Sequence, residues 1–284
     1  MAYEISLAQK VVLLSGADGF FGPYFTEALL RAGATVVAVG RSHPASGQYG
    51  EQFADFFKES EKDGHLAVFM VDYYDEEATR KTYEEIIEVH PHIDILINNA
   101  FDFSVRTGFN DESGRLENIS REQFMAGLES GLWWAVRATQ VFGPRMKAQG
   151  SGVVINTCSM YASVVPDANL YVGTNQFNPP TYSAAKHGLR AFTRYTASFL
   201  GPEVRANSFS PGAIPRFDDS FHGHKQTTDH APDSILGKLT AKTLSKRLGH
   251  PKDLAPTVVF LASDEASGFI NGADIPIDGG HTAT

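Results

Sequence analysis

The sequence is poor in cysteine, in basic residues and in long apolar runs. Cys158 is the one cysteine among 284 residues, so no disulfide can form within the chain, which is typical of a reducing compartment. Lysine and arginine number 24 against 33 acidic residues, and the net charge of −9 argues against a nucleic-acid-binding surface. No apolar run is long enough to span a bilayer, and residues 1–10 lack the pattern of a secretory signal. We therefore expect a soluble, cytoplasmic protein that binds neither nucleic acid nor membrane.

What the sequence does contain is a regular alternation of short apolar segments with longer amphipathic ones. Strands that are covered on both faces have this composition, and the alternation predicts an α/β fold with a doubly wound parallel sheet of about seven strands and helices on both faces. No repeat or linker divides residues 1–284, which predicts one domain. The expected strands are residues 10–15, 35–39, 67–71, 93–98, 152–157, 204–208 and 274–277, and the expected helices are residues 23–32, 51–62, 76–90, 121–149, 181–200 and 251–263.

A glycine-rich turn follows the first expected strand and opens a helix. Gly16, Gly19 and Gly22 would let the backbone approach a pyrophosphate, and the helix N-terminus would offer N–H groups to it. The alternative is an ordinary glycine-rich turn. No acidic residue stands at positions 40–42, where one would bind the ribose 2′-hydroxyl of NAD, whereas Arg41 is placed to pair with a 2′-phosphate or to face solvent. The sequence thus predicts NADP(H) as the preferred cofactor and NAD(H) as the second choice.

Tyr182 and Lys186 are four residues apart in an expected helix, which puts them on one face. A phenol with a pKa of about 10 is a poor base, and a neighbouring ammonium would lower that pKa. Such a tyrosine could exchange a proton with an alcohol while hydride moves to or from a nicotinamide. A Tyr–Lys pair is common on helix surfaces, so a catalytic interpretation of this pair depends on the motifs around it.

Those motifs occur in a fixed order. Taken together they resemble the short-chain dehydrogenase/reductase superfamily, and in particular its compact single-domain branch. Besides the glycine turn and the Tyr–Lys pair, the resemblance rests on Asp72, Asn98-Asn99-Ala100, Ser159, Pro211-Gly212, residues 247–255 and Asp278-Gly279-Gly280.

The resemblance implies a Rossmann-type NAD(P)-binding domain and assigns roles to its residues. Ser159 would position the substrate oxygen, Tyr182 would be the general acid or base, and Lys186 would lower the tyrosine pKa and bind the nicotinamide ribose. Asp72 and Asn98 would flank the adenosine, although Asp72 also suits a turn or a helix cap and Ser159 a strand end. The implied cofactor-binding residues are Gly16, Asp18, Gly19, Phe20, Gly22, Arg41, Asp72, Asn98, Ala100, Tyr182, Lys186, Pro211, Gly212 and Ile214.

Four features depart from the family pattern. Phe20 stands where the compact branch places its middle glycine, and the observed spacing is commoner in the extended branch that includes sugar-nucleotide epimerases. Phe101 replaces the glycine of the family's Asn-Asn-Ala-Gly motif. Gly131 replaces an asparagine that in the family helps to relay protons, and this glycine within an expected helix indicates a bend. Ser159 and Tyr182 are 23 residues apart, an insertion that resembles those of relatives acting on sugars.

Residues 213–246 form an irregular polar segment that corresponds to the family's substrate-binding loop. Arg216 in it would meet an anionic substrate or face solvent. The segment also contains acidic and histidine side chains, but we expect a polar lid rather than a metal site. These side chains are Asp218, Asp219, His222, His224 and His230.

The sequence therefore predicts an NAD(P)(H)-dependent oxidoreductase that interconverts a secondary alcohol and a ketone on a sugar-like or polar small molecule. One alternative is a sugar-nucleotide epimerase or dehydratase with tightly bound NAD, and another is a non-catalytic NADP-sensing protein. The resemblance also implies a homotetramer or homodimer that pairs through the long fourth and the fifth helices, where Trp133 and Trp134 would serve either the contact or the core.

Overall fold

The computed structural model of this chain describes residues 5–47, 49–174, 176–216 and 230–283. Seven parallel strands form one sheet in the order β3-β2-β1-β4-β5-β6-β7, which confirms the predicted fold class. Each predicted strand is present, with ends shifted by at most three residues. The strands are β1 (Val11–Ser15), β2 (Thr35–Gly40), β3 (Leu66–Met70), β4 (Ile95–Asn98), β5 (Gly152–Thr157), β6 (Val204–Pro211) and β7 (Asp274–Ile277).

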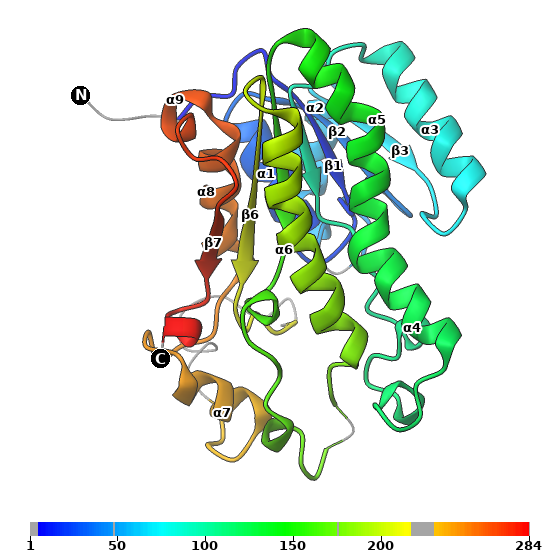
Figure 1. Cartoon of the computed structure of the whole chain (residues 1–284). Coiled ribbons are helices and arrows are strands. Elements are labelled where there is room, and N and C mark those ends of the chain that lie inside the picture. The colour runs from blue at the N-terminus through cyan, green and yellow to red at the C-terminus, as the bar shows by residue number, and fades with distance from the viewer. Residues whose placement is uncertain (1–4, 48, 175, 217–229, 284) are drawn as a thin grey trace.

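Helices cover both faces of this sheet, as Figure 1 shows. Successive strand residues point to opposite faces: Val12 and Leu14 belong to the core beneath α1 (Gly22–Arg31), α2 (Ala54–Lys62) and α8 (Pro251–Ala262). Leu13 belongs to the core beneath α3 (Glu76–Val89), α5 (Trp134–Gln149) and α6 (Pro180–Leu200). Both faces of the sheet are therefore buried, which explains why its strands are almost wholly apolar.

The long helix predicted at residues 121–149 is interrupted. It consists of α4 (Arg121–Leu128), a π-helical turn (Glu129–Trp133) and α5. A Cβ atom on Gly131, inside the turn, would lie 2.6 Å from the Cβ atom of Ala185 on α6. The turn thus brings the backbone at Gly131 against α6, which agrees with the predicted bend.

The segment at residues 213–246 is not irregular throughout, because it contains helix α7 (Ile235–Lys242). Ser234 caps this helix through its hydroxyl, which accepts a hydrogen bond from the Gly237 N–H at 3.0 Å. A short helix, α9 (Asp264–Ser267), follows α8. Asp218, Asp219, His222 and His224 lie outside the described residues. None of the helices in the described ranges combines the length and the apolarity that a membrane span requires.

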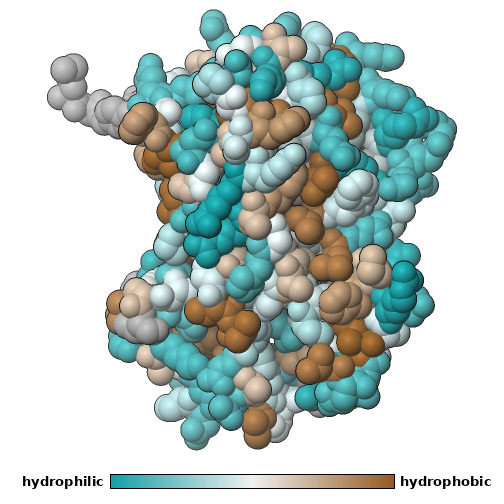
Figure 2. All heavy atoms as spheres, in the orientation of Figure 1, coloured by the Kyte–Doolittle hydropathy of each residue, from teal (hydrophilic) through white to brown (hydrophobic). Residues whose placement is uncertain are grey.

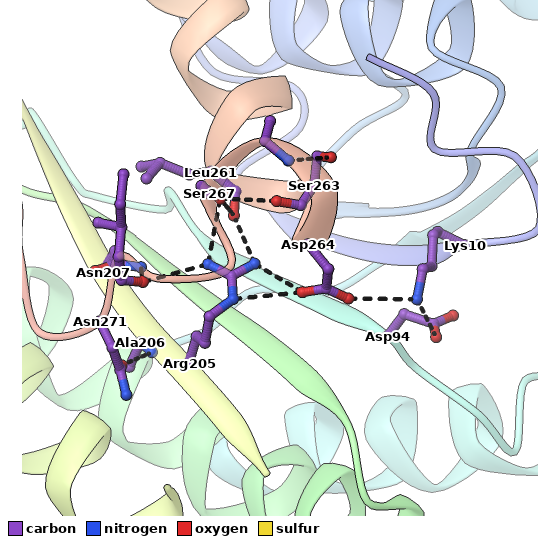
Figure 3. A network of polar contacts seen from close by, with 12 residues as sticks. Lys10, Asp94, Arg205, Ala206, Asn207, Leu261, Ser263, Asp264, Ser267 and Asn271 are labelled. Atoms are coloured by element: carbon purple, nitrogen blue, oxygen red, sulfur yellow. Dashed lines mark hydrogen bonds and ion pairs between the residues drawn. The ribbon is translucent and has the colours of Figure 1, made fainter. Parts of the chain in front are cut away.

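A buried arginine ties the amino-terminal half of β6 to the end of α8 and to α9. Arg205 donates to the Asp264 carboxylate at 2.9 Å, to the Ser267 hydroxyl at 3.3 Å and to two backbone carbonyls, those of Leu261 and Ile270. Figure 3 shows its guanidinium held among these groups, with Lys10 on the outer side of Asp264. This network anchors the end of the sheet that lies away from the strands' carboxyl ends.

Candidate active site

A cavity of about 520 Å³ lies at the carboxyl ends of the strands, the edge toward which the arrows of β6 and β7 point in Figure 1. Open α/β sheets bind ligands at this edge, and the volume suits a small ligand or cofactor. The loops that follow β1, β2, β3, β4, β5 and β6 all contribute to the wall. Most of the predicted site residues line it, namely Gly16, Asp18, Gly19, Phe20, Arg41, Asp72, Ala100, Ser159, Tyr182, Lys186, Pro211, Gly212 and Ile214.

The glycine turn forms one end of the cavity. Gly16 has a φ of +66°, and a Cβ atom there would lie 2.7 Å from the Cα atom of Ala100, so only glycine fits. The Asn99 side-chain amide donates to the Gly16 carbonyl at 3.1 Å, and the Ser15 hydroxyl accepts from the Asn99 N–H at 3.0 Å. These bonds clamp the turn against the end of β4. Gly16, Gly19 and Phe20 of the turn line the cavity beside the start of α1, so the residues present fit a dinucleotide.

Two predicted cofactor residues lie away from the cavity wall. The Asn98 side chain is 5% exposed and donates to the Asn156 carbonyl oxygen at 2.8 Å within the sheet, while the next residue, Asn99, lines the cavity. The structure therefore places Asn99 rather than Asn98 on the cavity wall. Gly22 starts α1, where a Cβ atom would collide with the Ala17 carbonyl, so its glycine serves the turn itself.

Ser159, Tyr182 and Lys186 come together at the other end of the cavity. Pro179 and Pro180 set the start of α6, which places Tyr182 in its first turn and Lys186 one turn later. The Lys186 ammonium donates to the Thr157 carbonyl at the end of β5, at 2.8 Å. Ser159 follows this strand, and its hydroxyl accepts from the Tyr161 N–H at 3.1 Å. The end of one strand and the start of one helix thus build the constellation.

Burial dominates the acid–base properties of this pair. It raises the pKa of Tyr182 to about 12, and a hydrogen bond with Ser159 opposes that rise. Burial also lowers the pKa of Lys186 to about 8. The sequence-based expectation of a lowered tyrosine pKa is therefore wrong for the protein alone, because desolvation is the largest influence on the pKa of this phenol and Lys186 does not offset it. At neutral pH Tyr182 holds its proton and Lys186 its charge.

Aromatic side chains surround the Tyr182 ring. Phe101 and Phe109 meet it edge to face, with ring centres at 5.1 and 5.2 Å, and Phe103 lies at 5.8 Å. The Lys186 ammonium lies 5.1 Å from the centre of the Phe101 ring, within the range of a cation–π contact. This apolar wall buries both Tyr182 and Lys186 and accounts for both pKa directions.

Two of the departures from the family pattern are parts of one structural feature. A Cβ atom on Gly131 would lie 3.0 Å from the Phe101 ring as well as close to Ala185. The bulky ring at position 101 thus occupies room that the glycine at position 131 leaves open. At position 131, where the family often has an asparagine, this protein instead packs a glycine against the apolar side chains of Phe101 and Ala185, next to Lys186.

Several residues of the cavity wall are not among the site residues predicted from the sequence. They lie in the loops that follow β3 and β4 or at the end of β5, and position at the strands' carboxyl ends is the signal that could have found them. They include Tyr73, Tyr74, Asn99, Asp102, Phe103, Ser104, Phe109, Asn110, Thr157 and Cys158. Burial raises the pKa of the Cys158 thiol to about 12, which makes it unreactive. In the described part of the chain, no group of three or more histidine, cysteine or acidic residues is placed to hold a metal ion.

Comparisons with known proteins match this chain along nearly its whole length. The family model described as enoyl-(acyl carrier protein) reductase matches residues 21–282. A 3-oxoacyl-[acyl-carrier-protein] reductase from Thermotoga maritima is 27% identical over 276 residues, covering 96% of this chain and 98% of that protein.

Two solved structures have a similar fold, each with a TM-score of 0.77 and 26% identity. One is a short chain dehydrogenase from Leptospira borgpetersenii with bound NAD+, covering 98% of this chain and 94% of that one. The other is a putative NAD(P)-dependent gluconate 5-dehydrogenase from Beutenbergia cavernae with bound NADP, covering 99% and 100%. Relatives of this kind do not favour the epimerase alternative.

Proposed function

This chain belongs to the short-chain dehydrogenase/reductase superfamily of nicotinamide-dependent oxidoreductases that act on CH–OH groups, and we propose that it interconverts a secondary alcohol and a ketone through Ser159, Tyr182 and Lys186. The observation that carries the proposal is one continuous cavity. It joins a glycine turn suited to a pyrophosphate with a buried tyrosine that has a serine and a lysine beside it. A purely dinucleotide-sensing protein would not need these three side chains.

The nicotinamide ring, when bound, supplies hydride for ketone reduction or accepts it in alcohol oxidation. In reduction, the Tyr182 phenol donates its proton to the substrate oxygen, and its pKa of about 12 keeps that proton available at neutral pH. The Ser159 hydroxyl donates a hydrogen bond to the same oxygen and holds it in place. The Lys186 ammonium binds the nicotinamide ribose and stabilises the phenolate that remains. In oxidation the same groups act in reverse.

For the substrate, we propose a polar, hydroxylated molecule with an acidic group, such as a sugar acid. The aromatic rings of Phe103 and Phe109 offer apolar faces to a carbon ring or chain, while Ser104 and Asn110 add polar groups to the same wall. Arg216 lines the mouth with its guanidinium 5.8 Å from the centre of the Phe103 ring, exposed and able to pair with a carboxylate. The similar fold of a putative gluconate 5-dehydrogenase supports this class.

A screen of sugar acids, polyols and neutral cyclic alcohols with both dinucleotides tests the activity and the substrate class together. We expect turnover with hydroxy acids. Arg216→Ala should raise KM for an acidic substrate about tenfold while leaving KM for a neutral alcohol unchanged, since an ion pair accounts for a difference of that order. Arg121→Ala, which removes an exposed arginine at the start of α4, is the matched control. Equal losses on acidic and neutral substrates would contradict the role of Arg216, and dinucleotide binding without any turnover would support the sensing alternative.

We also propose that the protein forms a homodimer or homotetramer through the face of α5 and α6. Figure 2 shows hydrophobic residues gathered on this face. Tyr195 and Phe199 of α6 stack at 5.8 Å between ring centres and are 62% and 63% exposed. Trp133, the last residue of the π-helical turn, is 39% exposed, whereas Trp134 belongs to the core. Exposed stacked rings of this kind favour a protein–protein contact.

Light scattering tests this assembly. Phe199→Glu should convert the oligomer into smaller species, because a buried charge at an interface is unfavourable. Val89→Glu on α3 changes an equally exposed apolar residue, 64% exposed, and should leave the mass unchanged. A wild-type protein that is monomeric at all concentrations would contradict the proposal.

A further inference from the structure

Asp18 lies in the glycine turn, but its side chain reaches the end of β2. Its Oδ2 atom accepts hydrogen bonds from the backbone N–H groups of Arg41 and Ser42 and from the Ser42 hydroxyl, each at 3.1 Å. These partners are 23 and 24 residues further along the chain. The carboxylate is therefore held rigidly at the carboxyl end of the second strand, although its backbone belongs to the turn after the first.

Gly40 makes room for this arrangement. A Cβ atom there would collide with the Asp18 Oδ1 atom and lie 2.7 Å from its Cγ atom. Both residues line the cavity, at the end formed by the glycine turn. The aspartate in one loop and the glycine in the other thus fit each other as a pair.

The end of the second strand is where dinucleotide-binding folds recognise the adenosine ribose. A carboxylate at this place accepts a hydrogen bond from the 2′-hydroxyl of NAD. Positions 40–42 contain no acidic residue, but Asp18 supplies a carboxylate at the same place from the neighbouring loop. We propose that Asp18 recognises the adenosine ribose of the cofactor and makes this protein select NAD(H) over NADP(H). The proposal rests on the nicotinamide-dependent function and reverses the preference for NADP(H) that Arg41 predicts from the sequence.

The surroundings of Asp18 disfavour the extra phosphate of NADP. That group would bring negative charge against a carboxylate, and the two backbone N–H groups best placed to bind it already donate to Asp18. Asp72 lines the same end of the cavity and adds a second carboxylate. The Arg41 side chain is exposed to water, which screens its attraction for a phosphate.

Isothermal titration calorimetry on the purified full-length protein tests this selection without any substrate. We expect the wild-type protein to bind NADH at least about tenfold more tightly than NADPH, which corresponds to the loss of a single well-placed polar contact. Asp18→Asn keeps the size of the side chain and removes its charge. It should reduce the ratio of the NADPH dissociation constant to the NADH dissociation constant by about tenfold or more. Arg41→Ala should leave NADH binding within about twofold of the wild type.

The controls separate the possible failures. Asp63→Asn, an exposed residue at the end of α2, makes the same change in net charge away from the cavity and should not alter the ratio. Tighter binding of NADPH than NADH by the wild type would overturn the proposal, as would an unchanged ratio in Asp18→Asn. Because the wild-type comparison needs no variant, a folding defect cannot conceal the answer. Binding of neither dinucleotide would overturn the nicotinamide-dependent function itself, and the role of Asp18 with it.

Discussion

Tyr182 and Lys186 are 9% and 4% exposed, and this burial determines which of them titrates first. Desolvation disfavours the charged form of each group, so the tyrosine keeps its proton to a pH of about 12 while the lysine loses its charge near pH 8. In the proposed reaction, Lys186 would therefore limit activity on the alkaline side. A proton donor would remain present above pH 8, but the positive charge proposed to stabilise the phenolate would not.

The pH dependence of ketone reduction should show this limit. The kcat/KM value reports groups of the free enzyme, and it should fall as pH rises through about 8, because Lys186 is charged below its pKa and neutral above it. Lys186→Arg retains its charge at high pH and, although slower, should lack this limb. A fall of kcat/KM at the same pH in the wild type and in Lys186→Arg would show that a group other than Lys186 titrates there.

At the scale of elements, periodicity predicts which segments are strands and helices but not where two elements touch. The apolar strands were predictable because both faces of the sheet are covered. The π-helical turn holds Gly131 so close to Phe101 and Ala185 that neither neighbour leaves room for a Cβ atom, and both are far away in sequence. The glycine alone indicated a bend, and its partner Phe101 was noticed only as a departure from a motif.

Substitution of Gly131 tests this contact. Alanine is favoured over glycine in a helix by about 1 kcal/mol, but its Cβ atom would lie 2.6 Å from that of Ala185, and overpacking costs about 1–3 kcal/mol. We expect Gly131→Ala to lower the free energy of unfolding measured in urea. Ala185→Gly should remove the clash, so the double variant should be more stable than the two single effects predict. A Gly131→Ala protein more stable than the wild type would show that the two helices do not touch here.

At the scale of the whole molecule, the sheet separates a stabilising end from a reacting end. The Arg205 network binds β6 to α8 and α9 at the amino-terminal half of the strand, and the cavity lies at the carboxyl ends. The two ends share no side chain, so stability and ligand binding should respond to different substitutions. Figure 1 shows the intervening length of β6.

Arg205→Met is the substitution that tests this separation. It removes one donor each from the Leu261 carbonyl, the Ile270 carbonyl and the Ser267 hydroxyl, although the two carbonyls keep a bond from Ser267 and from Asn207. It also removes one partner of the Asp264 carboxylate, and it should lower the free energy of unfolding by roughly 1–3 kcal/mol. Dinucleotide affinity should stay within about twofold of the wild type. Lys10→Met removes only two partly exposed ion pairs, with Asp94 and Asp264, and should cost less than about 1 kcal/mol. A large loss of dinucleotide affinity in Arg205→Met would contradict the separation.

The site residues that could be predicted from the sequence are those whose motif partners lie close by in the chain. Tyr182 and Lys186 are one helical turn apart, and the glycines of the turn lie close together in the sequence, from Gly16 to Gly22, so both signals could be recognised directly. Ser159 required the order of motifs. The aromatic wall and the reach of Asp18 to β2 could not be predicted, because they arise from loops that meet only when parallel strands align their carboxyl ends.

The central claim is that Tyr182 transfers the proton in a nicotinamide-dependent reaction, and Tyr182→Phe measures this most directly. Turnover and dinucleotide affinity are determined on the same preparation, with Tyr195→Phe, an exposed tyrosine of the same helix, as the control. We predict that Tyr182→Phe lowers kcat by a factor on the order of 100 or more while its dissociation constant for the dinucleotide stays within about twofold, and that Tyr195→Phe changes neither. Turnover close to that of the wild type in Tyr182→Phe would contradict the account.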